Sequence, residues 1–175
     1  MTKTIIITGA SQGIGQTTAE AFLDAGWIVG CLARNADKLA AFCDIHDGAV
    51  PLAADVSDSA AVEAAFADFI DKTGRLDALF NNAGRGSAAL PIDEIDDETW
   101  NSVVGVNLTG MFNCARAAFR QMRAQDPQGG RTCYWQSRVA NEIFSTPALR
   151  VFVRPEGQAK AKEAASELDT ASAGS

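Results

Sequence analysis

The sequence predicts an α/β fold built on a doubly wound parallel sheet. Short β-branched or apolar runs alternate with amphipathic stretches through the first 131 of its 175 residues. The first of these runs, at 3–8, leads directly into a glycine-rich segment and then into a helical pattern. Continuous apolar strands are buried on both faces, so the helices between them must cover both sides of the sheet.

Each element has a local reason. The helix expected at 17–25 ends at Gly26, which suits a helix C-terminus, and the helix at 59–72 carries its apolar side chains on one face. A long helix is expected to start at the acidic segment 96–99, because acidic side chains suit the positive end of a helix. It runs to about Arg123. The other expected elements are strands at 3–8, 27–32, 49–53 and 76–80 and a helix at 36–43. This predicts a sheet truncated after the fourth strand and the long helix.

The composition is that of a globular protein, with 47% hydrophobic and 21% charged residues. No run reaches the roughly 18 apolar residues that span a bilayer, and the N-terminus carries no cleavable signal. The four cysteines are scattered, and His46 is the only histidine, so neither a disulfide framework nor a histidine metal cluster is expected. We therefore expect a cytoplasmic protein with no membrane segment and no metal site.

Charge divides the chain in two. The net charge of -7 argues against nucleic-acid binding, which needs a basic face. Residues 1–131 hold 10 basic and 17 acidic side chains, whereas residues 132–175 hold 5 of each. We expect a dinucleotide-binding domain at 1–131 and a divergent, partly disordered tail at 132–175, whose end is rich in Ala, Ser, Glu, Lys and Gly.

The glycine-rich segment predicts an anion site. A strand that leads through Gly9, Gly13 and Gly15 into a helix N-terminus points backbone N–H groups and the positive helix end at one spot. Such a spot suits a pyrophosphate, and a Cβ there would block its close approach. A tight turn formed for packing reasons would give the same three glycines.

Four short motifs stand in order along residues 3–131, namely 8–15, Asp55-Val56, 81–84 and Val106-Asn107. Together they resemble the motif set of the short-chain dehydrogenase/reductase family, which implies a Rossmann-type fold and an NAD(P)-dependent oxidoreductase. The resemblance implies that the cofactor pyrophosphate and its ribose are surrounded by Gly9, Ser11, Gly13, Ile14 and Gly15. It implies that the adenine is contacted by Asp55 and Val56, and the nicotinamide-side ribose by Asn82, Ala83 and Gly84. It also implies that Asn81 braces the sheet and that Asn107 is the catalytic asparagine.

Some of these residues have a simpler interpretation. Asp55 could cap the helix that starts near Ser59, and the segment 81–84 could be an ordinary turn. Asn107 is harder to explain in this way, because asparagine is a poor helix former and a mid-helix position needs a polar reason.

The end of the second strand predicts the choice of cofactor. An acidic side chain there selects NAD through the ribose hydroxyls, whereas an arginine accommodates the 2′-phosphate of NADP. The sequence has Ala33 at the acidic position and Arg34 directly after it, which favours NADP over NAD. The alternative is a solvated arginine at the start of a helix.

The resemblance weakens after Arg131. The family's Tyr-x-x-x-Lys pair is absent, although Ser137 lies near the expected place of its catalytic serine. Tyr134 and Arg138 mimic the spacing of the pair but stand where a fifth strand should be. A change of reading frame near codon 131 would explain the missing motifs and the shift in charge together.

Two functions follow. The first is an NADP-linked oxidoreductase that acts on a small-molecule carbonyl or alcohol, with Asn107 and Ser137 as catalytic residues. The second is a catalytically inactive dinucleotide-binding remnant, since Asn107 and Ser137 do not titrate near neutral pH and cannot replace a proton donor. In either case the long helix is expected to expose apolar side chains, so the chain should form homo-oligomers or aggregate.

Overall fold

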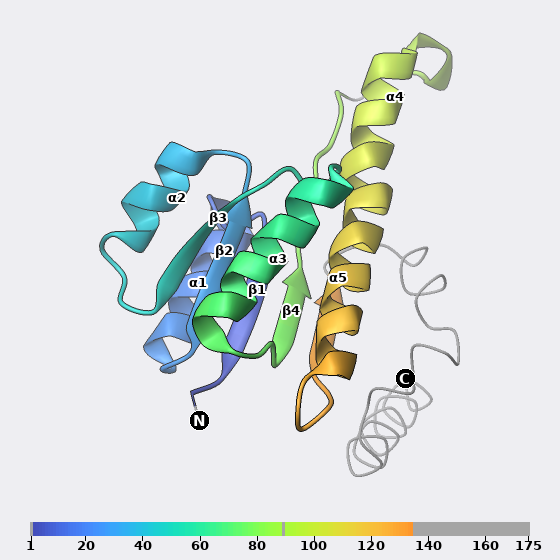
Figure 1. Cartoon of the computed structure of the whole chain (residues 1–175). Helices are drawn as coiled ribbons and strands as arrows, with labels where there is room; N and C mark the ends of the chain where they lie inside the picture. The colour runs from blue at the N-terminus through green and yellow to red at the C-terminus, as the bar shows by residue number, and fades with distance from the viewer. Residues whose placement is uncertain (1, 89, 135–175) are drawn as a thin grey trace, which may run out of the picture.

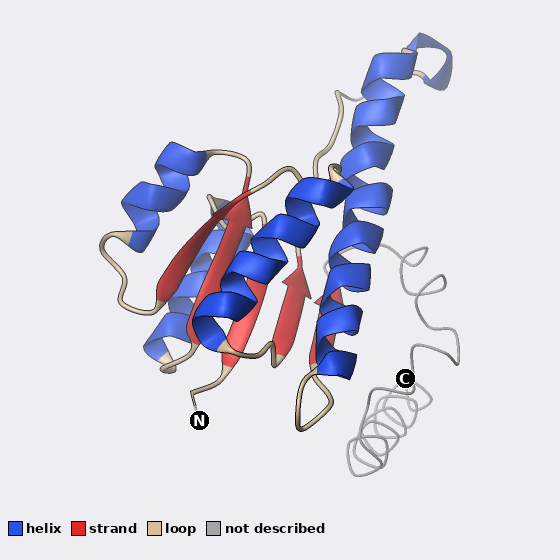
Figure 2. Cartoon of the chain, in the orientation of Figure 1, coloured by secondary structure: helices blue, strands red, loops and turns tan. Residues whose placement is uncertain are grey.

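The computed structural model describes residues 2–88 and 90–134. Its centre is a parallel sheet in the order β3-β2-β1-β4-β5 (Figures 1 and 2). The strands are β1 (Thr4–Thr8), β2 (Ile28–Ala33), β3 (Ala49–Ala53), β4 (Ala78–Asn81) and β5 (Arg131–Tyr134). The helices are α1 (Gly13–Asp24), α2 (Ala36–Cys43), α3 (Ser59–Thr73), the 3₁₀ turn η1 (Ile92–Glu94), α4 (Asp97–Val104), the π-helical turn η2 (Gly105–Gly110) and α5 (Met111–Ala124).

The helices cover both faces of the sheet, as the apolar strands require. One core packs α3 and α5 against the face that carries Ile6, and the other packs α1 and α2 against the face that carries Ile5 and Ile7. Figure 1 shows α3 and α5 on the near side of the sheet and α1 behind it. The predicted doubly wound, Rossmann-type parallel sheet is therefore confirmed.

β1 is the centre of this arrangement. All five of its residues are buried, and Ile6 is in register with Gly30 of β2 on one side and Leu79 of β4 on the other. From β1 the chain first forms β2 and β3 on one side of the sheet. It then crosses over and forms β4 and β5 on the other side. In open α/β sheets such a switch point is where ligands bind, at the carboxyl ends of the strands.

The long helix expected at 96–123 is present, but it is interrupted. The turn η2 separates α4 from α5. Its last residue, Gly110, packs so closely on Val56 that a Cβ on Gly110 would overlap the Val56 side chain. The buried Asn81 of β4 donates from Nδ2 to the carbonyl of Met111 at 2.8 Å. The predicted brace of the sheet is thus a direct bond from β4 to the start of α5.

The sheet does not stop after its fourth strand. Residues Arg131–Tyr134 form β5, parallel to β4, with Ala78 in register with Arg131 and Asn81 with Tyr134. The expectation of a four-stranded sheet is wrong in this detail. β5 alternates exposed and half-buried residues, and among the residues that the structure describes it has a neighbouring strand on one side only. A strand of this kind has no apolar run to predict it, and it carries the sheet across the boundary expected at Arg131.

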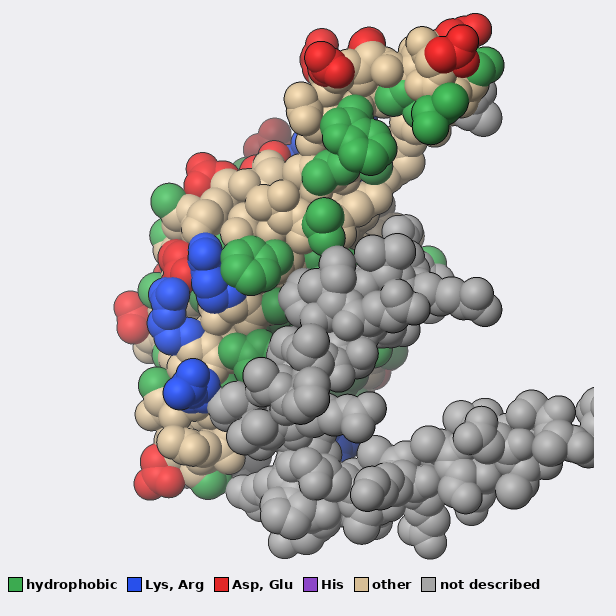
Figure 3. Space-filling view, turned by 90° about the vertical axis from the view of Figure 1, so that its right-hand side faces the viewer, with side chains coloured by type: hydrophobic (Ala, Val, Ile, Leu, Met, Phe, Trp, Pro, Cys, Tyr) green, Lys and Arg blue, Asp and Glu red, His purple; other side chains and the backbone are tan. Residues whose placement is uncertain are grey.

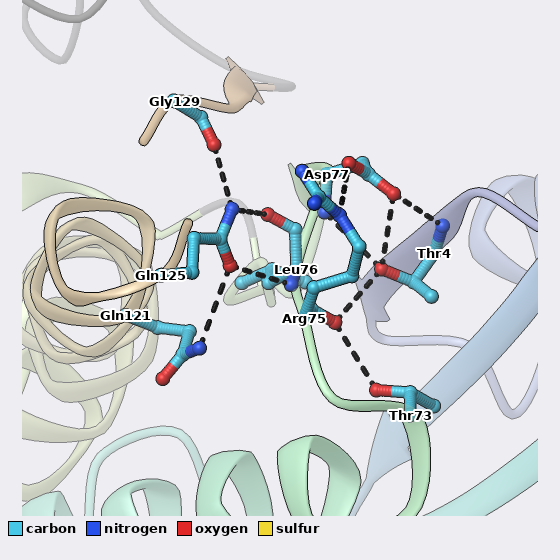
Figure 4. Close-up of polar contacts among 8 residues, drawn as sticks. All are labelled: Thr4, Thr73, Arg75, Leu76, Asp77, Gln121, Gln125 and Gly129. Atoms are coloured by element: carbon cyan, nitrogen blue, oxygen red, sulfur yellow. Dashed lines mark hydrogen bonds and ion pairs between the residues drawn. The ribbon is translucent and has the colours of Figure 1, made fainter. Parts of the chain in front are cut away.

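The amino ends of the strands are closed by polar contacts within the chain (Figure 4). Asp77 accepts hydrogen bonds from the Thr4 backbone at 3.0 Å and from Arg75 Nε at 2.8 Å. The buried Gln125, at the end of α5, pairs with both backbone groups of Leu76 at 2.9 Å and donates to the carbonyl of Gly129 at 2.7 Å. These contacts join β1, β4 and α5. They also occupy polar groups that a ligand could otherwise bind at this end of the sheet.

Among the described residues, none of the helices combines the length and apolar character that crossing a membrane requires.

Candidate functional site: a cavity at the carboxyl ends of the strands

The glycine-rich loop connects β1 to α1 and is shaped by close backbone approach. Gly9 has a φ of +71°, and its N–H donates to the carbonyl of Leu32 in β2 at 2.8 Å. A Cβ on Gly15 would overlap the carbonyl oxygen of Gly9 and would lie 2.7 Å from Asn82 Nδ2. Glycine is therefore required at both positions by the chain itself, and the loop lies tightly against the end of β4.

The N-terminus of α1 is left without a cap. Its N-cap residue, Gln12, makes no side-chain hydrogen bond to the helix, and the first turn holds no acidic side chain. By contrast, Asn35, Asp58 and Asp96 cap α2, α3 and α4 with their side-chain oxygens. The first N–H groups of a helix need an acceptor. At α1 this acceptor can be an anion from outside the chain.

Thr8 organises the same region, although it was not among the expected site residues. Its Oγ1 accepts hydrogen bonds from the backbone N–H groups of Asn82 at 2.9 Å and Ala83 at 2.8 Å. Asn82 returns a bond from Nδ2 to the Thr8 carbonyl at 2.9 Å. These bonds hold the turn after β4 against the glycine-rich loop. A hydroxyl at the last strand position before the first glycine is the sequence signal that could have pointed to it.

Asp55 and Val56 follow β3, at the edge that the carboxyl ends of the strands form. Asp55 does not cap α3, as the simpler interpretation required, because Asp58 does. Both the N–H and the hydroxyl of Ser57 donate to Asp55 Oδ1, at 2.9 and 2.7 Å. Partial burial raises the pKa of Asp55, but the bonds from Ser57 and the charge of Arg34 outweigh it, so the pKa lies below its usual value.

These segments enclose one cavity of about 770 Å³. All eleven residues expected to bind the cofactor line it, together with Gln12, Leu32, Ala33, Asn35, Lys38, Ala54, Arg85, Gly86 and Val106. Arg34, at the end of β2, lies 3.9 Å from Asp55 Oδ2 through its Nη1 and is 64% exposed. The cavity thus has an uncapped helix end at one place and two cations, Arg34 and Lys38, at another. The expected cofactor-binding residues are Gly9, Ser11, Gly13, Ile14, Gly15, Arg34, Asp55, Val56, Asn82, Ala83 and Gly84.

Asn107 lies beside this cavity, within η2. Its amide pairs with the backbone of Arg85, accepting from the N–H at 2.8 Å and donating to the carbonyl at 2.9 Å. Arg85 also bonds through its guanidinium to the hydroxyl of Ser102. The polar reason for an asparagine at this position is therefore the loop after β4. Lone π-helical turns often mark functional sites.

The other expected catalytic residue is not part of this geometry. Ser137 and Arg138 lie outside the described residues. Tyr134 is on β5 rather than on a helix, and burial raises its pKa, which a hydrogen bond with Thr132 offsets only in part. A proton donor works best with a pKa near the operating pH, so this phenol is poorly suited to the role.

Comparison with known proteins agrees with this geometry. The family model described as short chain dehydrogenase matches residues 3–146, beyond Arg131. The chain is 31% identical over 173 residues to a 3beta-hydroxysteroid dehydrogenase of Mediterraneibacter gnavus, covering 97% of this chain and 59% of that protein. It is 35% identical over 120 residues to a sulfoacetaldehyde reductase of Chromohalobacter salexigens, covering 67% of this chain and 47% of that protein. The chain therefore spans only about half the length of these relatives.

Solved structures are similar in the same way. A 3-ketoacyl-(acyl-carrier-protein) reductase of Brucella melitensis, complexed with NADH, has a TM-score of 0.73 and 29% identity, covering 80% of this chain and 59% of that one. A short-chain type dehydrogenase/reductase of Mycobacterium marinum has a TM-score of 0.72 and 32% identity, covering 83% and 59%. This chain belongs to the short chain dehydrogenase family, whose Rossmann fold binds NAD(P).

Proposed function

We propose that this protein is an oxidoreductase that binds NADP and acts on a small-molecule carbonyl or alcohol. The observation that carries the proposal is the cavity of about 770 Å³ that all the expected cofactor-binding residues line beside the uncapped end of α1. When bound, the nicotinamide supplies the hydride. The residues of this chain would bind and orient the dinucleotide in this cavity, beside which Asn107 lies.

The proposed roles follow the position of each residue along the cavity. The part of the loop from Ser11 to Gly15 offers N–H groups to the pyrophosphate, because the α1 N-terminus lacks an internal acceptor. Asp55 and Val56 bind the adenine end, and the segment 82–84 binds the ribose next to the nicotinamide. Asn107 holds the loop after β4 in place through Arg85 and acts as the catalytic asparagine.

NADP is proposed over NAD because of the residues at the end of β2. Ala33 has no carboxylate to receive ribose hydroxyls, and Arg34 is exposed and lines the cavity directly after it. Lys38 lines the cavity from the first turn of α2. A 2′-phosphate would meet two cations there, whereas the 2′-hydroxyl of NAD would meet no matching acceptor from Ala33.

A second candidate is a protein that binds the nucleotide without turnover. It is favoured by Tyr134, the only tyrosine in the chain, whose position on β5 and raised pKa do not suit proton transfer. The full activity of the longer relatives is a proposal for this chain, which spans about half their length. Three expectations stay predictions: the catalytic role of Ser137, the cytoplasmic location and a separate character for the segment after Arg131.

We also propose that the chain associates with itself through α4, η2 and α5. Trp100, Leu108 and Phe112 recur every four or eight residues and are 60%, 42% and 46% exposed. Figure 3 shows hydrophobic side chains along this face, with acidic side chains gathered at its upper end and basic ones, beside further acidic ones, lower down. An antiparallel pair would bring the acidic end, near Asp97, toward the basic end, near Arg123, of the other copy.

The test is titration of the purified chain into NADPH, followed by the fluorescence of the nicotinamide. We expect saturable binding that Gly13→Val weakens at least tenfold, because a side chain at Gly13 meets no protein atom and would occupy the cavity. Gly74→Val, at another glycine with positive φ and open surroundings, is the matched control for backbone strain. Binding that is absent, or that both variants weaken equally, would contradict the proposal.

A further inference from the structure

Two side chains of opposite charge meet at the edge of the nucleotide cavity. Arg34 Nη1 and Asp55 Oδ2 are 3.9 Å apart, and the two side chains are 64% and 38% exposed. Both line the cavity, one after β2 and the other after β3. An ion pair of this length and exposure is weak, so a stronger anion can replace the carboxylate at the guanidinium.

The two partners are held very differently. Asp55 is fixed by two hydrogen bonds from Ser57 to its Oδ1, which leaves Oδ2 turned toward Arg34. The same bonds and the nearby guanidinium keep the pKa of Asp55 low despite partial burial, so the carboxylate is charged at neutral pH. Arg34 has no other ion pair within the described residues. When a ligand binds, Arg34 is the partner that can change its position.

We propose that Asp55 is a specificity-determining residue that limits the preference of this site for NADP. Its Oδ2 holds Arg34 in the free chain, and a 2′-phosphate must take the guanidinium from it. NADH carries a hydroxyl in place of the phosphate and needs no such exchange. The inference rests on the proposed function, in which Arg34 receives the 2′-phosphate.

The exchange acts on NADPH in two ways. Separating Arg34 from Asp55 costs the energy of their pair, and the phosphate then lies close to a carboxylate that Ser57 keeps in place. Both effects oppose NADPH and leave NADH unchanged, since only NADPH brings the extra charge. The adenine contacts of Asp55 are common to the two nucleotides and cancel in the ratio of their affinities.

The experiment is calorimetric titration of the wild type and Asp55→Asn with NADPH and NADH. Asparagine keeps the size of the side chain and an oxygen for Ser57 but removes the charge. We expect the affinity ratio of NADPH to NADH to rise about two- to fivefold, the scale of an exposed ion pair. Ser57→Ala is the matched control, because it removes the hydroxyl's bond to the same carboxylate but leaves the backbone N–H bond that holds Asp55 and leaves the charge. It should change both affinities alike.

A second background separates competition for Arg34 from direct repulsion. In Arg34→Ala, Asp55→Asn should raise the ratio less than it does in the wild type, because only the repulsion between the carboxylate and the phosphate remains. A rise of the same size in that background would overturn the inference. A wild type that prefers NADPH, with a ratio that Asp55→Asn leaves unchanged or lowers, would also overturn it. A wild type that binds NADPH no better than NADH would instead refute the proposed function.

Discussion

The two ends of the sheet differ in what satisfies their polar groups. At the amino end, Asp77 binds Thr4 and Arg75, and Gln125 pairs with both backbone groups of Leu76 (Figure 4). At the carboxyl end, α1 begins without a cap and charged side chains line an open cavity. Internal bonds stabilise the first end, whereas the second keeps its bonding capacity for a ligand.

This difference separates stability from function along the same strands. Thr4 and Thr8 are the first and last residues of β1, and both are buried. Thr4 takes part in the closed network, while Thr8 positions the turn after β4 beside the cavity. Substitutions at the amino end should therefore change the free energy of unfolding, and substitutions at the carboxyl end should change nucleotide affinity.

The largest expected effect is on turnover at the carboxyl end. Hydride transfer to a carbonyl builds negative charge on oxygen. None of the described residues is placed as a proton donor beside the cavity, and the lack of one costs about 10² to 10⁴-fold in rate. We expect the 175-residue chain to oxidise NADPH with aldehydes and ketones more slowly, by about this factor, than an enzyme with a positioned proton donor. Tyr134→Phe should leave this residual rate unchanged. Fast turnover that Tyr134→Phe abolishes would refute this prediction.

A large effect on stability is expected at the amino end. Gln125→Ala would leave the buried N–H and carbonyl of Leu76 without their partner, at a cost of about 2 to 4 kcal/mol in the free energy of unfolding. Chemical denaturation measures this loss. NADPH affinity, measured well below the unfolding transition, should stay within about twofold of the wild type. A variant that keeps its stability but loses nucleotide binding would reverse the comparison.

The surface of α4, η2 and α5 should carry self-association. Leu108→Lys places a charge within the exposed apolar stripe and should weaken dimerisation at least tenfold, about 1.4 kcal/mol. Ile45→Lys is the control, because Ile45 is 76% exposed and lies outside this stripe. Analytical ultracentrifugation at micromolar concentration distinguishes the variants. A wild type that sediments as a monomer would show that this face does not bind a second copy.

Local signals predicted much of the fold. The bounds of α2 and β3 agree with the expected ranges, because Asn35 caps the helix and Gly48, with a φ of +85°, precedes the strand. α1 begins at Gly13, earlier than expected, because glycines that serve the loop also form its first turn. Neither β5 nor the turn η2 was predicted. Contacts distant in sequence produce both, namely pairing with β4 and packing of Gly110 on Val56.

The site was predicted less evenly. Glycines and an arginine after strands are visible in the sequence, and the structure brings them to one cavity. Thr8 was missed although its hydroxyl stands directly before the first glycine, whereas Lys38 and Arg85 were missed because a surface lysine and a loop arginine have no distinctive pattern. Their positions depend on which loops meet at the sheet edge. The pairing of Asn107 with Arg85 likewise depends on the interrupted helix, which no local pattern indicated.

The most direct test is a calorimetric comparison of NADPH and NADH binding to the wild-type chain and Arg34→Asp. If the carboxyl end is an NADP site, NADPH binds more tightly by about 1 to 3 kcal/mol, the scale of a charge-assisted hydrogen bond. Arg34→Asp reverses this order, while Arg123→Asp, an exposed arginine on α5, leaves it unchanged. Equal affinities of the wild type for the two nucleotides would contradict the account.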